Sequence, residues 1–273
     1  MSELQGSGPR ESREPGDAER EGAAPSASLA AHNQKIWEAS PQHFVDRRVE
    51  LVLELLPALG PEARLLDIGC LDGELTRLYA GRVGTRRVHG IDVALAERAR
   101  ANGVDALELD LNRGDPLPWP DASFDVVTCV ETLEHLIPTD HVVAEIRRVL
   151  KPGGTAVIDV PRLDSLLNVG LLALGFQPPG IECSRERRYG AINQGSVLTG
   201  HVAYFTRRAL LEMLEAAGLR VVEARQVGQR SGWLALQAAQ GRRVGPGLRL
   251  LWWLYDVLSL KKEYLVVKVQ GRA

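Results

Sequence analysis

The sequence predicts one α/β domain built on a doubly wound, parallel sheet. Short apolar, β-branched runs alternate with helical patterns over most of the 273 residues, and this alternation is typical of βαβ units. The hydrophobic content of 45% is enough for one sizeable core. Acids and glycines follow several of the runs, at the strand ends where such sheets bind ligands. We therefore expect an enzyme.

Five helices are expected from apolar residues at helical spacing. The first, 42–57, ends at Pro57, and the last, 206–218, is stopped by Gly218. Between them, helical patterns cover 73–82, 95–102 and 139–150. After the fourth helix, the sequence "LKPGG" predicts a turn, because Pro152 cannot continue a helix and two glycines permit positive φ.

Seven strands are expected from the apolar runs that separate these helices. Five of them carry the parallel pattern, and two more follow near the C-terminus. They span 63–69, 86–93, 104–111, 123–130, 155–161, 219–227 and 263–270.

Three segments fall outside this alternation. Residues 1–31 are rich in Gly, Pro, Ser, Glu and Arg and predict a disordered tail before a domain at 32–273. Residues 162–200 form a long connection, which is often a lid or substrate loop. Residues 244–262 hold an apolar insert that includes "LRLLWWLYDVLSL", too short to span a bilayer.

Composition narrows the classes of function. The net charge of −2 gives no global sign of nucleic-acid binding, which we do not expect. The three cysteines, Cys70, Cys129 and Cys183, form no Cys-x-x-Cys pair, so no disulfide framework or zinc knuckle is predicted. The tail lacks the apolar core of a signal peptide. We expect a cytoplasmic setting.

The stretch "LLDIGCLDGELT" ends a strand at Asp67 to Gly69 and opens a helix at Gly73. Glycines there let the backbone approach a ligand at the helix N-terminus. About twenty residues on, Asp92 ends the next strand, where an acid can bind both hydroxyls of a ribose. Asp110 follows the third strand, in place to meet an adenine amino group. Together these residues predict an adenosine site.

With these motifs, the chain resembles the class I S-adenosylmethionine-dependent methyltransferases, in particular the branch of the ubiquinone-pathway enzymes (methyltransferase type 11). The likeness rests on "LLDIGC", "GIDV", "LDL", "LPWPDASFDVVTC", "ETLEHL", "EIRRVLKPGG" and "GHVAYFTRRALLEMLEAAGL", all in the family's order. It implies a Rossmann-like seven-stranded sheet and S-adenosyl-L-methionine as cofactor. The implied cofactor-binding residues are Asp67, Gly69, Cys70 and Gly73 for the methionine part, Asp92 and Val93 for the ribose, Asp110 and Leu111 for the adenine, and Val130 at the sulfonium. The family often has glycine in place of Leu71.

The stretch "VETLEHL" sets Glu131, Glu134 and His135 at helical spacing just past a strand end, so we expect all three to face one cavity. Three interpretations stay open. The residues are structural, or His135 or Glu131 is a general base, or they bind a divalent cation. In the third, the resemblance adds His201 of "GHVAYFT" as a further ligand. The catalytic candidates are therefore Glu131, His135 and His201.

These observations predict methyl transfer to an oxygen of a small or prenylated acceptor. Methylation of RNA 2′-hydroxyls, glycans or secondary metabolites is an alternative, and a catalytically silent binding module on the same fold is another. The apolar pieces "LLNVGLLALG" and "LRLLWWLYDVLSL" either pack on the domain or contact a lipid-like acceptor or a membrane surface. The sequence does not predict an oligomeric state.

Overall fold

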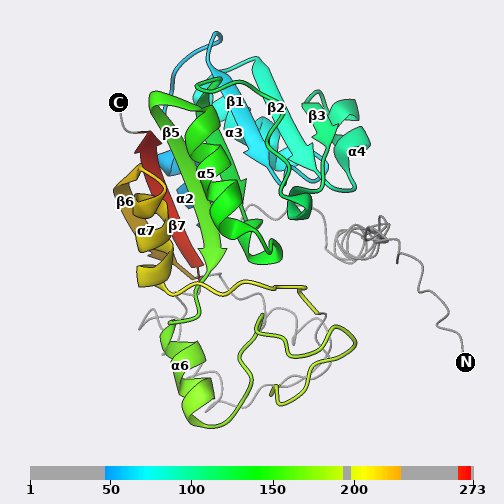
Figure 1. The fold of residues 1–273 in the computed structure, drawn as a ribbon, viewed down its shortest axis with the longest axis vertical. Helices are drawn as coiled ribbons and strands as arrows, with labels where there is room; N and C mark the ends of the chain where they lie inside the picture. The colour runs from blue at the N-terminus through cyan, green and yellow to red at the C-terminus, as the bar shows by residue number, and fades with distance from the viewer. Residues whose placement is uncertain (1–46, 193–197, 229–263, 272–273) are drawn as a thin grey trace, which may run out of the picture.

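The computed structural model describes residues 47–192, 198–228 and 264–271 (Figure 1). Their centre is one seven-stranded sheet in the order β3-β2-β1-β4-β5-β7-β6. Strands β1 to β5 run parallel, and β7 is antiparallel to both β5 and β6. The expected tail and the apolar insert lie outside the described residues. The predicted Rossmann-like α/β sheet is confirmed.

The elements follow the order expected from the sequence. The strands are β1 (Arg64–Ile68), β2 (Arg87–Asp92), β3 (Asp105–Glu108), β4 (Phe124–Val130), β5 (Leu150–Pro161), β6 (Leu219–Val227) and β7 (Tyr264–Gly271). The helices are α2 (Arg47–Leu55), α3 (Glu74–Val83), α4 (Ala96–Ala101), α5 (Thr139–Val149), α6 (Leu166–Ala173) and α7 (Arg207–Ala216). Two 3₁₀ turns, η1 (Leu111–Arg113) and η2 (Leu133–His135), follow β3 and β4.

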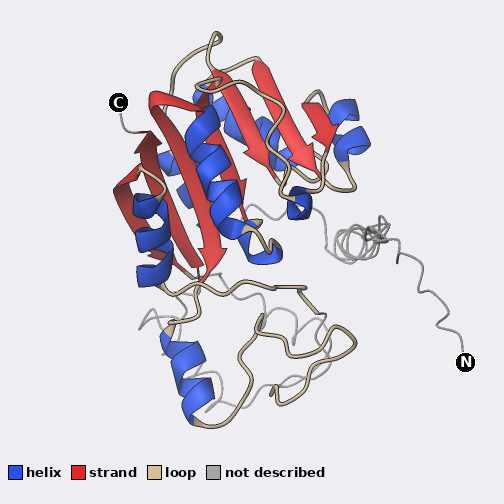
Figure 2. Ribbon diagram, viewed as in Figure 1, coloured by secondary structure: helices blue, strands red, loops and turns tan. Residues whose placement is uncertain are grey.

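Helices cover both faces of the sheet, which explains why its central strands are apolar without alternation (Figure 2). On β1, Leu65 belongs to a buried cluster with residues of α2 and α3. The next residue, Leu66, belongs to a second cluster with residues of α5 and α7. Neighbouring side chains of a strand point to opposite faces, and both are fully buried here.

One expected turn is part of a strand. The sequence "LKPGG" lies within β5, which begins at Leu150. Leu150 pairs with Phe124, but Thr155 already pairs with Val126, so the intervening residues of β5 form a bulge. Proline and glycine therefore interrupt the pairing of β5 with β4 only locally, because β5 pairs with β4 again after the bulge.

The long connection after β5 leaves the sheet and returns to the same point. Arg162 and Phe205 form an isolated parallel bridge, and the Leu163 amide donates to the Phe205 carbonyl at 2.8 Å. Between them lies α6, which the sequence analysis did not predict as a helix. Figure 1 shows this excursion beyond the edge of the sheet where the parallel strands end. No helix in the described ranges is long and apolar enough to cross a membrane.

The glycine at the end of β1 is required by packing. Gly69 has φ +80°, and a Cβ built on it would lie 2.1 Å from the Thr132 hydroxyl oxygen. We expect Gly69→Ala to lower the free energy of unfolding by about 2 kcal/mol or more. Gly81→Ala is the matched control, because Gly81 lies in α3 with no atom within 4 Å of its added Cβ. The control should leave stability unchanged or raise it by about 0.5–1 kcal/mol. Equal urea denaturation midpoints for the two variants would contradict this account.

Candidate active site

A buried carboxylate holds the floor of the site together. Asp67 on β1 accepts hydrogen bonds from the Thr76 hydroxyl of α3 at 2.5 Å and the Thr128 hydroxyl of β4 at 2.6 Å. All three side chains are buried. Burial raises the pKa of Asp67 to about 6, although both hydroxyl donors oppose the rise. Asp67 thus joins three elements, and the bonds to threonine occupy both of its oxygens.

The loop from β1 to α3 is shaped by backbone in the left-handed region. Gly69, Leu71 and Gly73 all have positive φ, and Leu71 adopts φ 48° despite its side chain. A non-glycine residue is disfavoured there by about 1–2 kcal/mol. The Leu71 amide is held by a hydrogen bond to Asp92 Oδ2 at 3.1 Å. The loop therefore reaches the end of β2, where the ribose acid was expected.

Asp92 organises this edge of the site. Its Oδ1 accepts from the amides of Ala94 and Leu95, both at 2.9 Å, and its Oδ2 accepts from Leu71. A carboxylate has about four lone-pair positions, so about one remains on Oδ2 for a ligand hydroxyl. This donor and acceptor set fits a ribose, and it also gives Asp92 a structural role that the sequence did not reveal.

The other expected cofactor residues are divided between surface and core. Asp110 is partly buried and caps η1 by accepting from the Asn112 amide at 3.0 Å. Val93 and Val130 are partly exposed at the ends of β2 and β4, whereas Leu111 is buried. The Cys70 side chain packs in a cluster with α4, and burial raises its thiol pKa. Cys70 can therefore offer a ligand only its backbone.

An ion-pair cluster that the sequence did not predict lies beside the end of β4. Arg48 of α2 pairs with Glu131, and its Nε lies 3.7 Å from an oxygen of Asp159, a fully buried residue of β5. The guanidinium also sits 4.8 Å from the centre of the Tyr264 ring. Glu131 has φ 50° and lies before η2. The expected continuous helical face from Glu131 to His135 is thus absent, because only Leu133–His135 form a helical turn.

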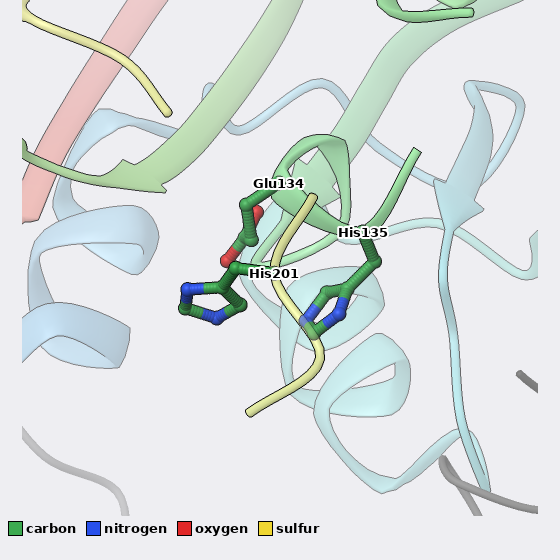
Figure 3. Close-up of side chains that lie close together, drawn as sticks. All are labelled: Glu134, His135 and His201. Atoms are coloured by element: carbon green, nitrogen blue, oxygen red, sulfur yellow. The ribbon is translucent and has the colours of Figure 1, made fainter. Parts of the chain in front are cut away.

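Three other candidate residues come together across the long connection (Figure 3). Ligand atoms of Glu134, His135 and His201 all lie within 4.8 Å of one another. The contact is fixed by backbone, because the amides of Val202 and Ala203 donate to the Glu134 carbonyl at 2.8 and 3.0 Å. The rings of His135 and His201 meet edge to face with centroids 4.9 Å apart.

Glu134 has an unusual electrostatic setting. Its side chain is 1% exposed, and neither carboxylate oxygen has a hydrogen-bond partner among the residues that the structure describes. Burial raises its pKa well above the ordinary value, and the charges of Glu131 and Asp159 add to the rise. The surroundings of Glu134 therefore favour its neutral form when nothing binds it. A cation at this point would favour its ionised form.

His201 has the opposite tendency. Burial lowers its pKa, although the charges of Glu131 and Glu182 partly oppose that effect. Its imidazole is therefore neutral near pH 7, which is the form that can accept a proton or bind a metal ion. The cluster can act as a general base, as a cation site, or as a proton-sharing pair of a neutral acid and a neutral imidazole.

Sequence reasoning missed two members of the site. Arg48 lies within the first expected helix, where an arginine is normally a surface residue. Asp159 interrupts the apolar strand "TAVIDVP". An acid in a buried strand requires a cation or hydrogen bonds, so this residue could have been predicted to have a polar partner. Neither residue belongs to a motif, so their pairing became visible only with the fold.

Comparison with known proteins assigns the class. The sequence model of a methyltransferase domain family matches residues 42–224, and the chain belongs to that family. It is a class I S-adenosylmethionine-dependent methyltransferase, with the fold and strand order described above. The predicted family resemblance is confirmed.

Individual relatives span most of this domain. A 27-O-demethylrifamycin SV methyltransferase from Amycolatopsis mediterranei is 32% identical over 204 residues, covering 71% of this chain and 68% of that protein. A probable S-adenosylmethionine-dependent methyltransferase from Mycolicibacterium smegmatis is 29% identical over 223 residues, covering 80% and 76%. The structure also resembles a chain of the complex between the Haloferax volcanii Trm112 methyltransferase activator and a putative methyltransferase, with a TM-score of 0.61, 17% identity, and 91% and 97% coverage.

Asp67 should make stability depend on pH in a defined direction. Its folded pKa of about 6 lies above its ordinary value of 3.8, so the folded state binds this proton more tightly. The resulting stabilisation is complete below about pH 4 and is lost as the pH rises through 6. Asp67→Asn cannot ionise. Its stability relative to the parent should therefore increase by on the order of 2–3 kcal/mol between pH 4 and pH 7. Chemical denaturation at several pH values measures this difference, and a difference independent of pH would contradict the assignment.

Proposed function

We propose that the protein transfers a methyl group from S-adenosylmethionine to a hydroxyl oxygen of a small, apolar acceptor. The observation that carries the proposal is the convergence of Glu134, His135 and His201 beside Glu131, at the strand ends next to the loop held by Asp92. A neutral, buried imidazole at that place is suited to remove a hydroxyl proton. The relative that acts on a demethylrifamycin supports an O-methylation of this kind.

The cofactor is held at the ends of β1, β2 and β3. Asp92 uses its free lone pair for the ribose, Asp110 and Leu111 border the adenine, and the backbone from Gly69 to Gly73 borders the methionine part. When bound, the cofactor supplies an electrophilic methyl group on a sulfonium. Arg48 pairs with Glu131 and so fixes its carboxylate next to Val130, where the sulfonium of the cofactor is expected. The Glu131 charge complements the sulfonium.

The acceptor lies on the other side of His201. A hollow there is lined by apolar side chains, Pro179, Ile181, Ala203 and Phe205 among them, together with His201 and Tyr204. Tyr204 donates its hydroxyl to the His201 carbonyl at 3.1 Å, which steadies the backbone on this side. Arg162 and Asn168 also line the hollow, so the lining is mixed, and the His201 imidazole is the neutral base among its polar groups.

Glu134, His135 and His201 are also the ligand set of an alternative, in which a divalent cation in place of the His201 imidazole activates the acceptor hydroxyl. Support comes from the buried Glu134 carboxyl, which lacks a hydrogen-bond partner in the described ranges, and from its closeness to two imidazoles. Such a ligand set suits Mg²⁺, Mn²⁺ or Zn²⁺. When bound, the cation would lower the pKa of the acceptor hydroxyl. His201 then serves as a ligand, and the base is a different group.

The proposal places the reaction in the cytoplasm, with a small molecule as the partner. Methylation of an RNA 2′-hydroxyl or a glycan uses the same proton chemistry and is the alternative reaction. A silent binding module would keep the cofactor site and transfer no methyl group. Labelled cofactor added to metabolite extracts, followed by mass spectrometry, distinguishes transfer from mere binding.

The cofactor role of Asp92 can be tested by substitution with asparagine. Asp92→Asn keeps one acceptor for the amides of Ala94 and Leu95, and its NH₂ group replaces the oxygen that accepts from Leu71 and carries the lone pair assigned to the ribose. We expect cofactor affinity to fall about ten-fold, the effect of losing a charged hydrogen-bond partner worth roughly 1.5 kcal/mol. Calorimetric titration measures it, with the exposed Asp115→Asn as the matched control. An affinity within twofold of the parent, at an unchanged melting temperature, would show that Asp92 does not contact the cofactor.

The cation site has a readout that does not require the acceptor. Because burial raises the pKa of Glu134 and a bound cation would favour its ionised form, Mn²⁺ binding should be accompanied by proton release. Titration calorimetry in buffers of different ionisation enthalpy measures that release. Glu134→Gln and His201→Asn should abolish Mn²⁺ binding, whereas His141→Asn, outside the cluster, should not. If the chelator-treated parent binds no Mn²⁺, the cation proposal is wrong and His201 remains the base.

A further inference from the structure

Helix α6 buries its polar residue and exposes apolar residues, which is the opposite of a typical surface helix. Its polar residue, Asn168, is 7% exposed, and its side-chain amide donates to the Arg162 carbonyl at 2.7 Å. The N-cap residue Ser165 is also buried, and its hydroxyl oxygen accepts from the backbone N–H of Asn168 at 3.2 Å. Leu166, by contrast, is 67% exposed. The polar groups thus face the protein, and apolar side chains face outward.

The exposed apolar residues on and just after α6 are together called the α6 patch. Its members share a position on or just after α6 and a large exposed fraction: Leu166, Val169, Leu172, Leu174 and Phe176. No charged residue occurs from Ser165 to Ile181. A patch of this kind on a folded domain marks an interaction site. Single exposed apolar residues elsewhere, such as Leu59, need no such explanation.

A cationic and aromatic pair adjoins the C-terminal end of the patch. The Gln177 amide donates to the Gly190 carbonyl at 3.0 Å, which brings the loop of residues 187–190 next to the end of α6. In that loop, the guanidinium of the exposed Arg187 lies over the exposed Tyr189 ring, 4.7 Å from its centre. Tyrosine and arginine are the side chains that favour the boundary between lipid tails and headgroups.

We infer that the α6 patch docks this protein on the surface of an anionic lipid membrane. An eight-residue helix is about 12 Å long, too short to span a bilayer and long enough to lie in its interface. A protein partner would be expected to meet polar groups that fix its register. The α6 patch offers none, because Asn168 is turned inward, and this composition fits a fluid apolar medium bordered by negative charge.

The position of the patch relates the membrane to the site. Asn168, on the inner side of α6, borders the same hollow as His201. Figure 1 shows α6 beyond the end of β5. Docking through the α6 patch would therefore place α6 between the bilayer and the hollow, within one helix diameter of the membrane surface. The inference concerns the surface alone, and it holds whatever molecule accepts the methyl group.

Sedimentation with vesicles tests the inference on the full chain. The parent should sediment with vesicles of phosphatidylglycerol and phosphatidylcholine, and less with phosphatidylcholine alone. The double variant Val169→Asp and Leu172→Asp should reduce the vesicle-bound fraction at least about ten-fold, because two charges replace two apolar contacts. Arg187→Glu should remove the preference for anionic vesicles. Melting temperature and cofactor affinity should not change in either variant.

Matched substitutions away from α6 provide the control. Leu59 and Ile137 are comparably exposed apolar residues in loops outside α6, and Leu59→Asp with Ile137→Asp should leave vesicle binding intact. Three results would overturn the inference. The parent fails to sediment with anionic vesicles, or the double α6 variant binds them as the parent does. In the third, ultracentrifugation shows a dimer that the α6 substitutions dissociate, which would make a second copy the occupant of the patch.

Discussion

The arrangement of the site depends on one buried hydrogen-bonded carboxylate. Asp67 receives the hydroxyls of Thr76 and Thr128, so a single side chain fixes the end of β1 against α3 and β4. Each oxygen is bonded, and burial still raises its pKa. The acid therefore holds the geometry at some energetic cost near neutral pH. The loop that follows β1 and the turn that follows β4 start from this junction, and the expected cofactor and acceptor residues lie on either side of it.

Two kinds of electrostatic environment meet at these strand ends. Around Asp92, backbone amides surround a carboxylate and keep it available to a ligand hydroxyl. Around Glu134, neighbouring acids and burial favour the neutral carboxyl, while burial also keeps His201 neutral. Arg48 pairs with Glu131 and Asp159 on the β5 side of these strand ends. A cationic methyl donor and a hydroxyl acceptor can thus be bound side by side in different surroundings.

Local sequence patterns were sufficient to predict the sheet. The features that they did not predict depend on contacts between residues far apart in the sequence. Alternation of apolar runs was sufficient for the strands, because buried parallel strands differ sharply from amphipathic helices. The Pro-Gly-Gly turn was misread, since a bulge lets β5 continue through it. Arg48 and Asp159 lacked any motif, because their pairing joins α2 to β5 across the fold. Helix α6 was missed because Asn168 is its one polar residue, so the segment lacks the alternation of polar and apolar residues that indicates a helix. Glu134 and His201 were predicted as neighbours through family resemblance, and spacing alone could not have placed them together.

The central claim is that the ends of β1 and β2 bind the methyl donor. Hydrogen–deuterium exchange of the full chain, with and without saturating S-adenosylmethionine, tests it most directly. Bound cofactor should slow exchange at the amides of residues 69–74 and 92–95, because the loop and the Asp92 turn are closed by the ligand. Peptides from α7 should exchange at the same rate in both states. Unchanged exchange at both strand ends, under conditions where titration shows binding, would place the cofactor elsewhere and contradict the account.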